Sequence, residues 1–234
     1  MAREFGEELN DNVFDIPELR KQVKVFRDRE HAGSVLSKML FLYNKTDAVV
    51  LGIPAGGVPV AAAIAFRLKL DLDVAVVSKI TLPWNTEAGY GAVAFDGTVQ
   101  LNQNIISQMG LTADEIRKGT DSAFLKVKRR FKKFRGGETL PDLKNRPVVL
   151  VDDGIASGFT MLVAVEALRK AGAIKIIVAV PTAHFQTLQR VAPTVDELYC
   201  ANVRAGWGFA VADAYRNWYD VGDEEVSAIL KKFR

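Results

Sequence analysis

The chain has 234 residues, of which 49% are hydrophobic and 25% are charged, and this balance excludes a disordered, collagen-like or coiled-coil protein. Its length fits one α/β domain with an appendage, or two small domains. The net charge of +3 is too small to require a nucleic-acid partner. The single cysteine, Cys200, excludes a disulfide framework and a cysteine-based zinc site, and it fits a reducing compartment.

The N-terminal stretch 1–15 is polar and acidic, without the apolar centre of a signal peptide. Further along the chain, no apolar run approaches the roughly 20 residues that cross a bilayer. We therefore expect a cytoplasmic protein with no membrane partner.

The apolar pattern alternates between helix-like and strand-like stretches. Nearly continuous β-branched runs predict strands that are buried on both faces, and amphipathic stretches between them predict helices. Helices are predicted at 32–42, 59–68 and 160–171, and strands at 48–51, 74–77, 148–151 and 174–180. The strand–helix–strand order indicates an α/β fold with a doubly wound parallel sheet.

Two further elements lie between the second and third strands. The stretch 92–101 predicts a hairpin, because Asp96-Gly97 is a strong two-residue turn signal. The stretch 112–135 predicts an amphipathic helix that ends at Gly136-Gly137, within a helical insertion at 103–137. Between Arg117 and Arg135, nine basic residues stand against one acid, so this helix carries a net charge of +8.

The stretch Val148–Thr160, VVLVDDGIASGFT, is the most informative in the chain. A buried strand ends in Asp152 and Asp153, and a loop of small residues then leads into a helix. Ligands of parallel sheets bind at the carboxyl ends of strands, and the N-terminus of a helix suits a phosphate. The paired acids suit sugar hydroxyls or a bridging Mg²⁺. The stretch therefore predicts a site for ribose 5-phosphate with a metal nearby.

This stretch resembles the phosphoribosyl pyrophosphate (PRPP) signature of the type I phosphoribosyltransferase family. Five further segments resemble an uncharacterised subgroup of that family, so that the resemblance covers roughly residues 24–230. They are Phe26-Arg27-Asp28-Arg29 with Ala32-Gly33, Gly52–Ala61, Gly91–Ala94, Phe134–Gly137 and Asp223–Val226. Two departures stand out: the subgroup usually has Arg at the position of Ala55, and the segment Trp207–Asp213 is altered.

The resemblance implies a single phosphoribosyltransferase domain over 1–234, with a hood over the base formed by the segments 1–45 and 200–234. It also implies an enzyme that moves the phosphoribosyl group of PRPP to a nitrogenous base and releases pyrophosphate, with Mg²⁺ as cofactor. A homodimer is expected. The implied catalytic residues are Lys79, Asp152 and Asp153, and the two aspartates are also the implied metal ligands.

The remaining implied roles concern substrate binding. The 5′-phosphate would lie at Ala156, Ser157, Gly158, Phe159 and Thr160, and the pyrophosphate at Ala55, Gly56 and Gly57. A mobile catalytic loop is expected at Thr81–Tyr90. The candidates for contact with the base are His184, Tyr215 and Trp218.

One alternative of a different class stays open. A regulatory protein of the same fold would sense PRPP or a nucleotide and bind RNA or DNA through the basic helix Arg117–Arg135, since fold does not determine function. We favour a simpler reading of that helix, in which its charge faces solvent or contacts an acidic patch of a second subunit.

Overall fold

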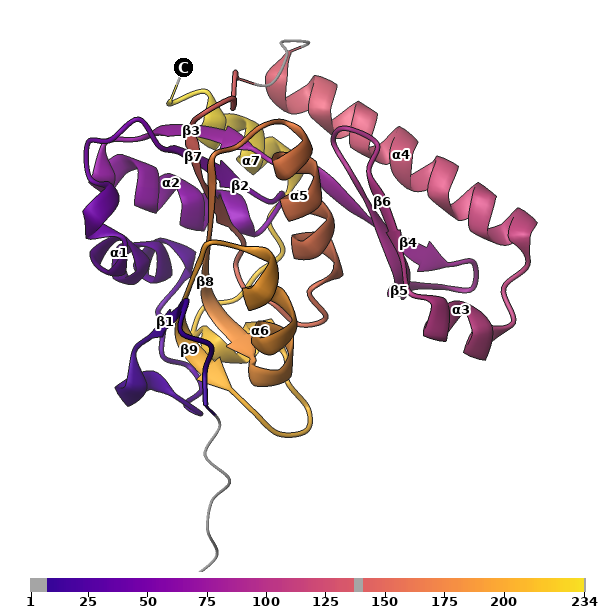
Figure 1. Cartoon of the computed structure of the whole chain (residues 1–234), viewed down its shortest axis with the longest axis horizontal. Helices are drawn as coiled ribbons and strands as arrows, with labels where there is room; N and C mark the ends of the chain where they lie inside the picture. The colour runs from indigo at the N-terminus through magenta and orange to yellow at the C-terminus, as the bar shows by residue number, and fades with distance from the viewer. Residues whose placement is uncertain (1–7, 137–140, 234) are drawn as a thin grey trace, which may run out of the picture.

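The computed structural model describes residues 8–136 and 141–233, and its central feature is a six-stranded parallel sheet in the order β1-β9-β8-β7-β2-β3 (Figure 1). Segments that are distant in the sequence therefore form neighbouring strands, as in the pair β2 and β7. The strands are β1 (Val13–Asp15), β2 (Val49–Gly52), β3 (Asp71–Val74), β7 (Pro147–Val151), β8 (Lys175–His184) and β9 (Glu197–Arg204). Gly137, at which the basic helix was predicted to end, lies outside the described residues.

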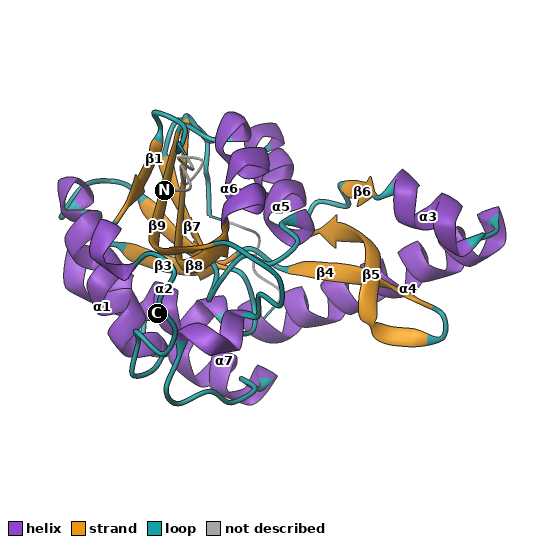
Figure 2. Ribbon diagram, turned by 90° about the horizontal axis from the view of Figure 1, so that it is seen from below, coloured by secondary structure: helices purple, strands orange, loops and turns teal. Residues whose placement is uncertain are grey.

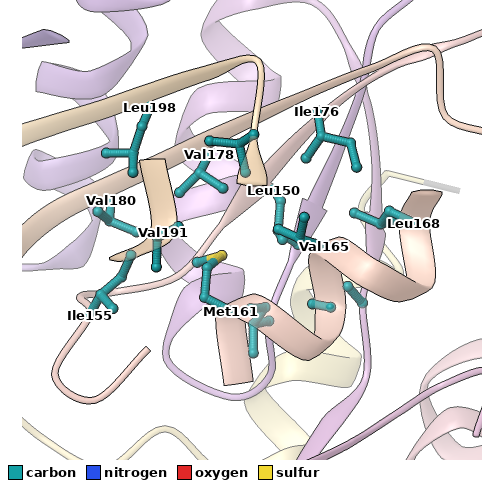
Figure 3. Close-up of a cluster of buried hydrophobic side chains, with 14 of the residues drawn as sticks. Leu150, Ile155, Met161, Val165, Leu168, Ile176, Val178, Val180, Val191 and Leu198 are labelled. Carbon is teal, nitrogen blue, oxygen red and sulfur yellow. The ribbon is translucent and has the colours of Figure 1, made fainter. Parts of the chain in front are cut away.

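Helices cover both faces of this sheet, as the continuous apolar runs predicted. Alternate strand residues point to opposite faces, so Val149 packs with α1 (Arg29–Met39) and α2 (Gly57–Leu68). Leu150 packs on the other face with α5 (Phe159–Lys170) and α6 (Phe185–Val191). Figure 3 shows this second cluster, where Met161, Val165 and Leu168 of α5 lie against the strands. The doubly wound parallel sheet is thus confirmed.

A second, smaller lobe extends from one edge of the molecule (Figure 2). It consists of the antiparallel strands β4 (Val77–Leu82), β5 (Asn85–Ala94) and β6 (Val99–Leu101) with the helices α3 (Gln103–Met109) and α4 (Ala113–Arg135). Its core contains Ile80, Tyr90 and Val127, and it is continuous with Val226 of α7 (Asp223–Leu230). The basic helix α4 therefore packs across this small sheet and against α7.

Most predicted elements are confirmed, including the turn at Asp96-Gly97, where Gly97 has φ +89°. The strand predicted at 74–77 is wrong. β3 ends at Val74, and β4 begins at Val77 in the other sheet, because one apolar run is buried in two different cores. β1 and β9 were not predicted. β9 contains buried Asn202, a polar residue that interrupts the apolar pattern. Its Oδ1 accepts a hydrogen bond from the Thr182 hydroxyl (2.7 Å), and its Nδ2 donates to the carbonyls of Leu19 and Gln22.

The two terminal segments meet beside the carboxyl ends of the strands. Phe26 donates its backbone N–H to Ala214 (2.9 Å) and accepts one from Arg216 (2.8 Å), so the two segments form a short parallel pairing. No helix in the described residues is long and apolar enough to cross a membrane.

Candidate functional site

The candidate site lies where the winding of the central sheet reverses. Gly52, the last residue of β2, pairs with Val151, the last residue of β7. The helix after β2 covers one face of the sheet and the helix after β7 covers the other (Figure 1). Ligands bind in a crevice outside the strand ends at such a point, and two cavities lie at these strand ends. The turn after β2 and the diacid after β7 therefore lie side by side, although 100 residues separate them in the sequence.

Asp152 and Asp153 occupy the floor of this crevice. Burial and the charge of Asp153 raise the pKa of Asp152 well above its ordinary value. Burial also raises the pKa of Asp153, and the guanidinium of Arg29 opposes that rise. Two recessed carboxylates with raised pKa values are poorly solvated, so a bound cation or hydroxyl donors would stabilise their ionised form.

Arg29 forms a buried ion pair with Asp153. Its side chain is only 5% exposed, and its Nε donates to Oδ2 of Asp153 at 2.9 Å. Its Nη1 donates to the carbonyl of Tyr219 at 2.9 Å, and its guanidinium lies 4.1 Å from the centre of the Trp218 ring. Arg29 therefore joins the N-terminal helix, the C-terminal segment and the diacid.

The turn after β2 packs directly on the diacid. A Cβ atom at Gly56 would overlap Oδ2 of Asp153, and one at Gly57 would lie 2.8 Å from the Cα of Asp152. The peptide between Pro54 and Ala55 is cis. The close approach, rather than an unusual φ at Gly56, explains why glycine is needed here.

The loop after the diacid forms a cavity of about 340 Å³. Gly158 has φ +79°, and α5 begins at the next residue, so the first-turn N–H groups of α5 have no acceptor within the helix. The carbonyl of Ala156 accepts a hydrogen bond from the Thr187 hydroxyl (2.6 Å), which fixes the loop to α6. The five predicted loop residues, Ala156, Ser157, Gly158, Phe159 and Thr160, all line this cavity.

A second cavity, of about 350 Å³, lies on the other side of the diacid. Ala55 and Gly56 of the turn line it, together with Asp152 and Asp153. The exposed Lys79 of β4 lines both cavities. Most of the predicted phosphate and pyrophosphate residues are thus brought together around two carboxylates.

The segment Thr81–Tyr90, expected as a mobile catalytic loop, forms the end of β4, a turn at Pro83-Trp84 and the start of β5. The hairpin formed by β4 and β5 borders both cavities. Lys79 of β4 lines both of them, and Gly89 of β5 lines the first.

The three base-binding candidates do not lie together. The Tyr215 side chain is buried, and its hydroxyl donates to the backbone carbonyl of Asp153 (2.6 Å). Trp218 stacks on Arg29 behind the diacid. His184 lies at the end of β8, where its ring is 3.2 Å from the Gly206 carbonyl and lines a separate hollow with Trp207 and Phe209. None of the three lines the two cavities described above, and their contact with a base stays a prediction.

Sequence reasoning missed several residues of the site. In the sequence, Arg29 stands beside Arg27 and Asp28, and such a cluster is typical of a capped helix start. Asp28 does cap α1, accepting the N–H of His31 (2.8 Å), but Arg29 turns away to Asp153. Cys200 is buried, and burial raises the pKa of its thiol.

Replacement of Arg29 by Met should destabilise the fold by about 3 kcal/mol, because the carboxylate of Asp153 would lose its buried partner. Urea unfolding at pH 7 measures this loss. Arg27→Met is the matched control, since Arg27 pairs with Asp28 at the surface. We expect no measurable change there, and equal midpoints for the two variants would contradict the role of Arg29.

Together these features define a doubly wound α/β protein with a candidate site at the switch point of its central sheet. Residues 27–214 match the family described as phosphoribosyl transferase domain. A protein of Mycobacterium tuberculosis, whose name assigns it provisionally to the phosphoribosyl transferases, is 37% identical over 210 residues, covering 90% of this chain and 47% of that protein. The crystal structure of TT1426 from Thermus thermophilus matches at a TM-score of 0.72 and 33% identity, covering 89% of this chain and 98% of that one.

A ribose-phosphate pyrophosphokinase of Pyrococcus furiosus is 43% identical over 63 residues, which are 26% of this chain and 23% of that enzyme. Because the family model matches residues 27–214, the chain belongs to the phosphoribosyl transferase domain family. The chain spans about half the length of the curated Mycobacterium relatives that it matches.

Proposed function

We propose that this chain is a Mg²⁺-dependent phosphoribosyltransferase, which transfers the phosphoribosyl group of PRPP to a nitrogenous base with release of pyrophosphate. The observation that carries this proposal is the arrangement at the switch point. One diacid separates a loop–helix cavity from a second cavity, and Lys79 lines both. PRPP has phosphate groups at its two ends and ribose hydroxyls between them, and this distribution of charge fits the two cavities and the diacid.

The residues fit a magnesium ion only if the substrate completes its shell. Among the described residues, no group of three or more His, Cys, Asp or Glu side chains could hold a metal. Mg²⁺ is commonly held by one or two carboxylates together with substrate oxygens and water. Asp152 is the better placed of the two, since Oδ2 of Asp153 already accepts from Arg29.

In the proposed reaction the chain binds and orients PRPP. The N–H groups at the start of α5, with Ser157 and Thr160, hold the 5′-phosphate. Asp152 and Asp153 face the ribose hydroxyls, and Lys79 with the turn at Ala55–Gly57 holds the pyrophosphate. Bound Mg²⁺ would supply charge stabilisation of the leaving pyrophosphate. Holding the ribose at both ends orients C1 for attack by the base nitrogen.

Ala156 restricts the choice of base. Its methyl group cannot accept a proton, so this loop position supplies no general base for a purine ring nitrogen. We therefore expect slow pyrophosphate release with hypoxanthine or guanine, and faster release with an acceptor that is already anionic, such as a pyrimidine. His184 and Glu87 are the candidates for a proton acceptor elsewhere, and the side chain of Glu87 lies outside the described part of the structure.

The experiment measures pyrophosphate release from PRPP and Mg²⁺ across a panel of purines and pyrimidines, with PRPP binding followed by calorimetry. Release with at least one base supports the transferase. Fast release with hypoxanthine or guanine, still fast in a His184→Ala, Glu87→Ala variant, would contradict the interpretation of Ala156. Absence of PRPP binding would contradict the proposal itself.

The second candidate is the regulatory protein that binds RNA or DNA. The exposed face of α4 favours it, because Lys128, Arg129 and Lys132 are exposed and make no ion pair with another described residue. PRPP binding without pyrophosphate release from any base would support this candidate. A cytoplasmic location and a homodimer stay predictions.

A further inference from the structure

The charges of α4 fall into two groups. Five of its nine basic residues between Arg117 and Arg135 pair with acids of the same chain: Arg117 and Lys118 with Asp114, Arg130 with Asp223, Lys133 with Glu224, and Arg135 with Asp73. Part of the helix charge is thus balanced within the chain, and the expected contact with an acidic patch of a second subunit stays a prediction. The basic residues without an ion-pair partner among the described residues are Lys126, Lys128, Arg129 and Lys132.

Within the second group, Lys126 differs from the rest by its position. It is the member that lines the cavity on the pyrophosphate side of the diacid, together with Lys79 and the Ala55–Gly56 turn. Arg130 lines the same cavity one turn further along α4, but its guanidinium is 2.7 Å from Asp223, which balances its charge. Lys126 is exposed, so its long side chain can move toward a ligand.

We propose that Lys126 binds the pyrophosphate group of PRPP, so that α4 forms one wall of the pyrophosphate subsite. The inference rests on the proposed function, because it assigns the second cavity to pyrophosphate. Pyrophosphate carries several negative charges and brings them next to Asp152 and Asp153, so the subsite needs cations that those carboxylates do not neutralise. Lys126 supplies a charge from the wall contributed by the small lobe.

This assignment also gives the inserted lobe a function at the site. β4 carries Lys79 and α4 carries Lys126, and both elements share one small core. Asp223 of α7 binds Arg130 and so ties α4 to the main domain. The lobe therefore presents two lysines to one cavity from one packed unit.

The test compares Lys126→Ala with Lys132→Ala. Both residues are exposed lysines of the same helix without an ion-pair partner among the described residues, but Lys132 is absent from the linings of the two cavities. Alanine favours the helix, so both variants should fold, and circular dichroism checks this. Calorimetry measures binding of inorganic pyrophosphate with Mg²⁺, and separately of ribose 5-phosphate.

Lys126→Ala should weaken pyrophosphate binding about 10-fold, the effect of losing one charged hydrogen bond, and leave ribose 5-phosphate binding unchanged. Lys126→Arg should restore most of the affinity, and Lys132→Ala should change neither ligand. Unchanged pyrophosphate binding in Lys126→Ala, or equal losses in Lys126→Ala and Lys132→Ala, would overturn the inference while the wild type still binds PRPP. A wild type that binds neither ligand would overturn the proposed function as well.

Discussion

Replacement of Asp152 and Asp153 together by Asn should weaken PRPP binding by about 100-fold or more, because two charged hydrogen-bond acceptors for the ribose hydroxyls or their metal are lost. Asn has nearly the same shape as Asp, and it can still accept the backbone N–H of residue 153, which now donates to Oδ1 of Asp152 at 2.8 Å. Asp153→Asn also leaves the buried guanidinium of Arg29 without a charged partner, which should cost about 3 kcal/mol of stability, so circular dichroism checks that the double variant is folded. Calorimetric titration of PRPP with Mg²⁺ measures the loss.

The single variant Asp152→Asn tests how the charge of the diacid affects the stability of the fold in the absence of ligand. The folded-state pKa of Asp152 is raised above its ordinary value by burial and by Asp153. Protonated Asp152 thus favours the folded state at low pH, and this stability is lost as the pH rises from about 4 through the folded-state value. At pH 7 Asp152→Asn should therefore be more stable than the wild type, and near pH 3 the two should be equally stable.

Urea unfolding at both pH values, without ligand, measures this difference. A variant that is less stable than the wild type at pH 7 would contradict the electrostatic account of the diacid. A double variant that binds PRPP within about two-fold of the wild type would contradict the assignment of the site, since charged hydrogen bonds of this kind exceed that effect.

The sheet could be predicted because its strands are buried on both faces and therefore appear as continuous apolar runs. The same rule explains the errors. Val74 and Val77 belong to one apolar run, yet they are buried in different sheets, and only the tertiary structure separates them. β9 was missed because Asn202 interrupts its apolar pattern. The hydrogen-bond partners of this side chain, which are Thr182 on the neighbouring strand and the carbonyls of Leu19 and Gln22, are distant in the sequence.

In the site, too, the residues of one short stretch could be predicted, and those that come from distant parts of the chain could not. The diacid and its loop lie in one short stretch, so the sequence predicted them together. Arg29, Thr187 and Lys126 reach the site from three other helices, and none has a local pattern that separates it from an ordinary surface residue. The nearest signal was the charge of α4, but the sequence alone does not say which of its basic residues faces the cavity.

Replacement of Gly56 by Ala should also weaken PRPP binding by about 100-fold, and the reason is steric. The backbone of Gly56 has φ −62° and ψ −30°, which alanine adopts without strain. The added Cβ would instead overlap Oδ2 of Asp153, and Arg29 holds that carboxylate in place. Either the turn or the carboxylate must move, so the diacid and the turn at Ala55–Gly57 lose their alignment. A displacement of about 1 Å in a substrate site can cost 100-fold.

Gly222→Ala is the matched control. Gly222 has φ −86°, and an added Cβ would meet only Oε2 of Glu224, at 3.7 Å. This variant should bind PRPP like the wild type, whereas Gly56→Ala should lose binding and about 1–3 kcal/mol of stability, the usual cost of overpacking. PRPP affinity by calorimetry and stability by urea unfolding are compared for the two variants. If Gly56→Ala binds PRPP as tightly as Gly222→Ala, then the contact between the turn and Asp153 does not align the site, because the overlap would have been relieved without moving either group that binds the substrate.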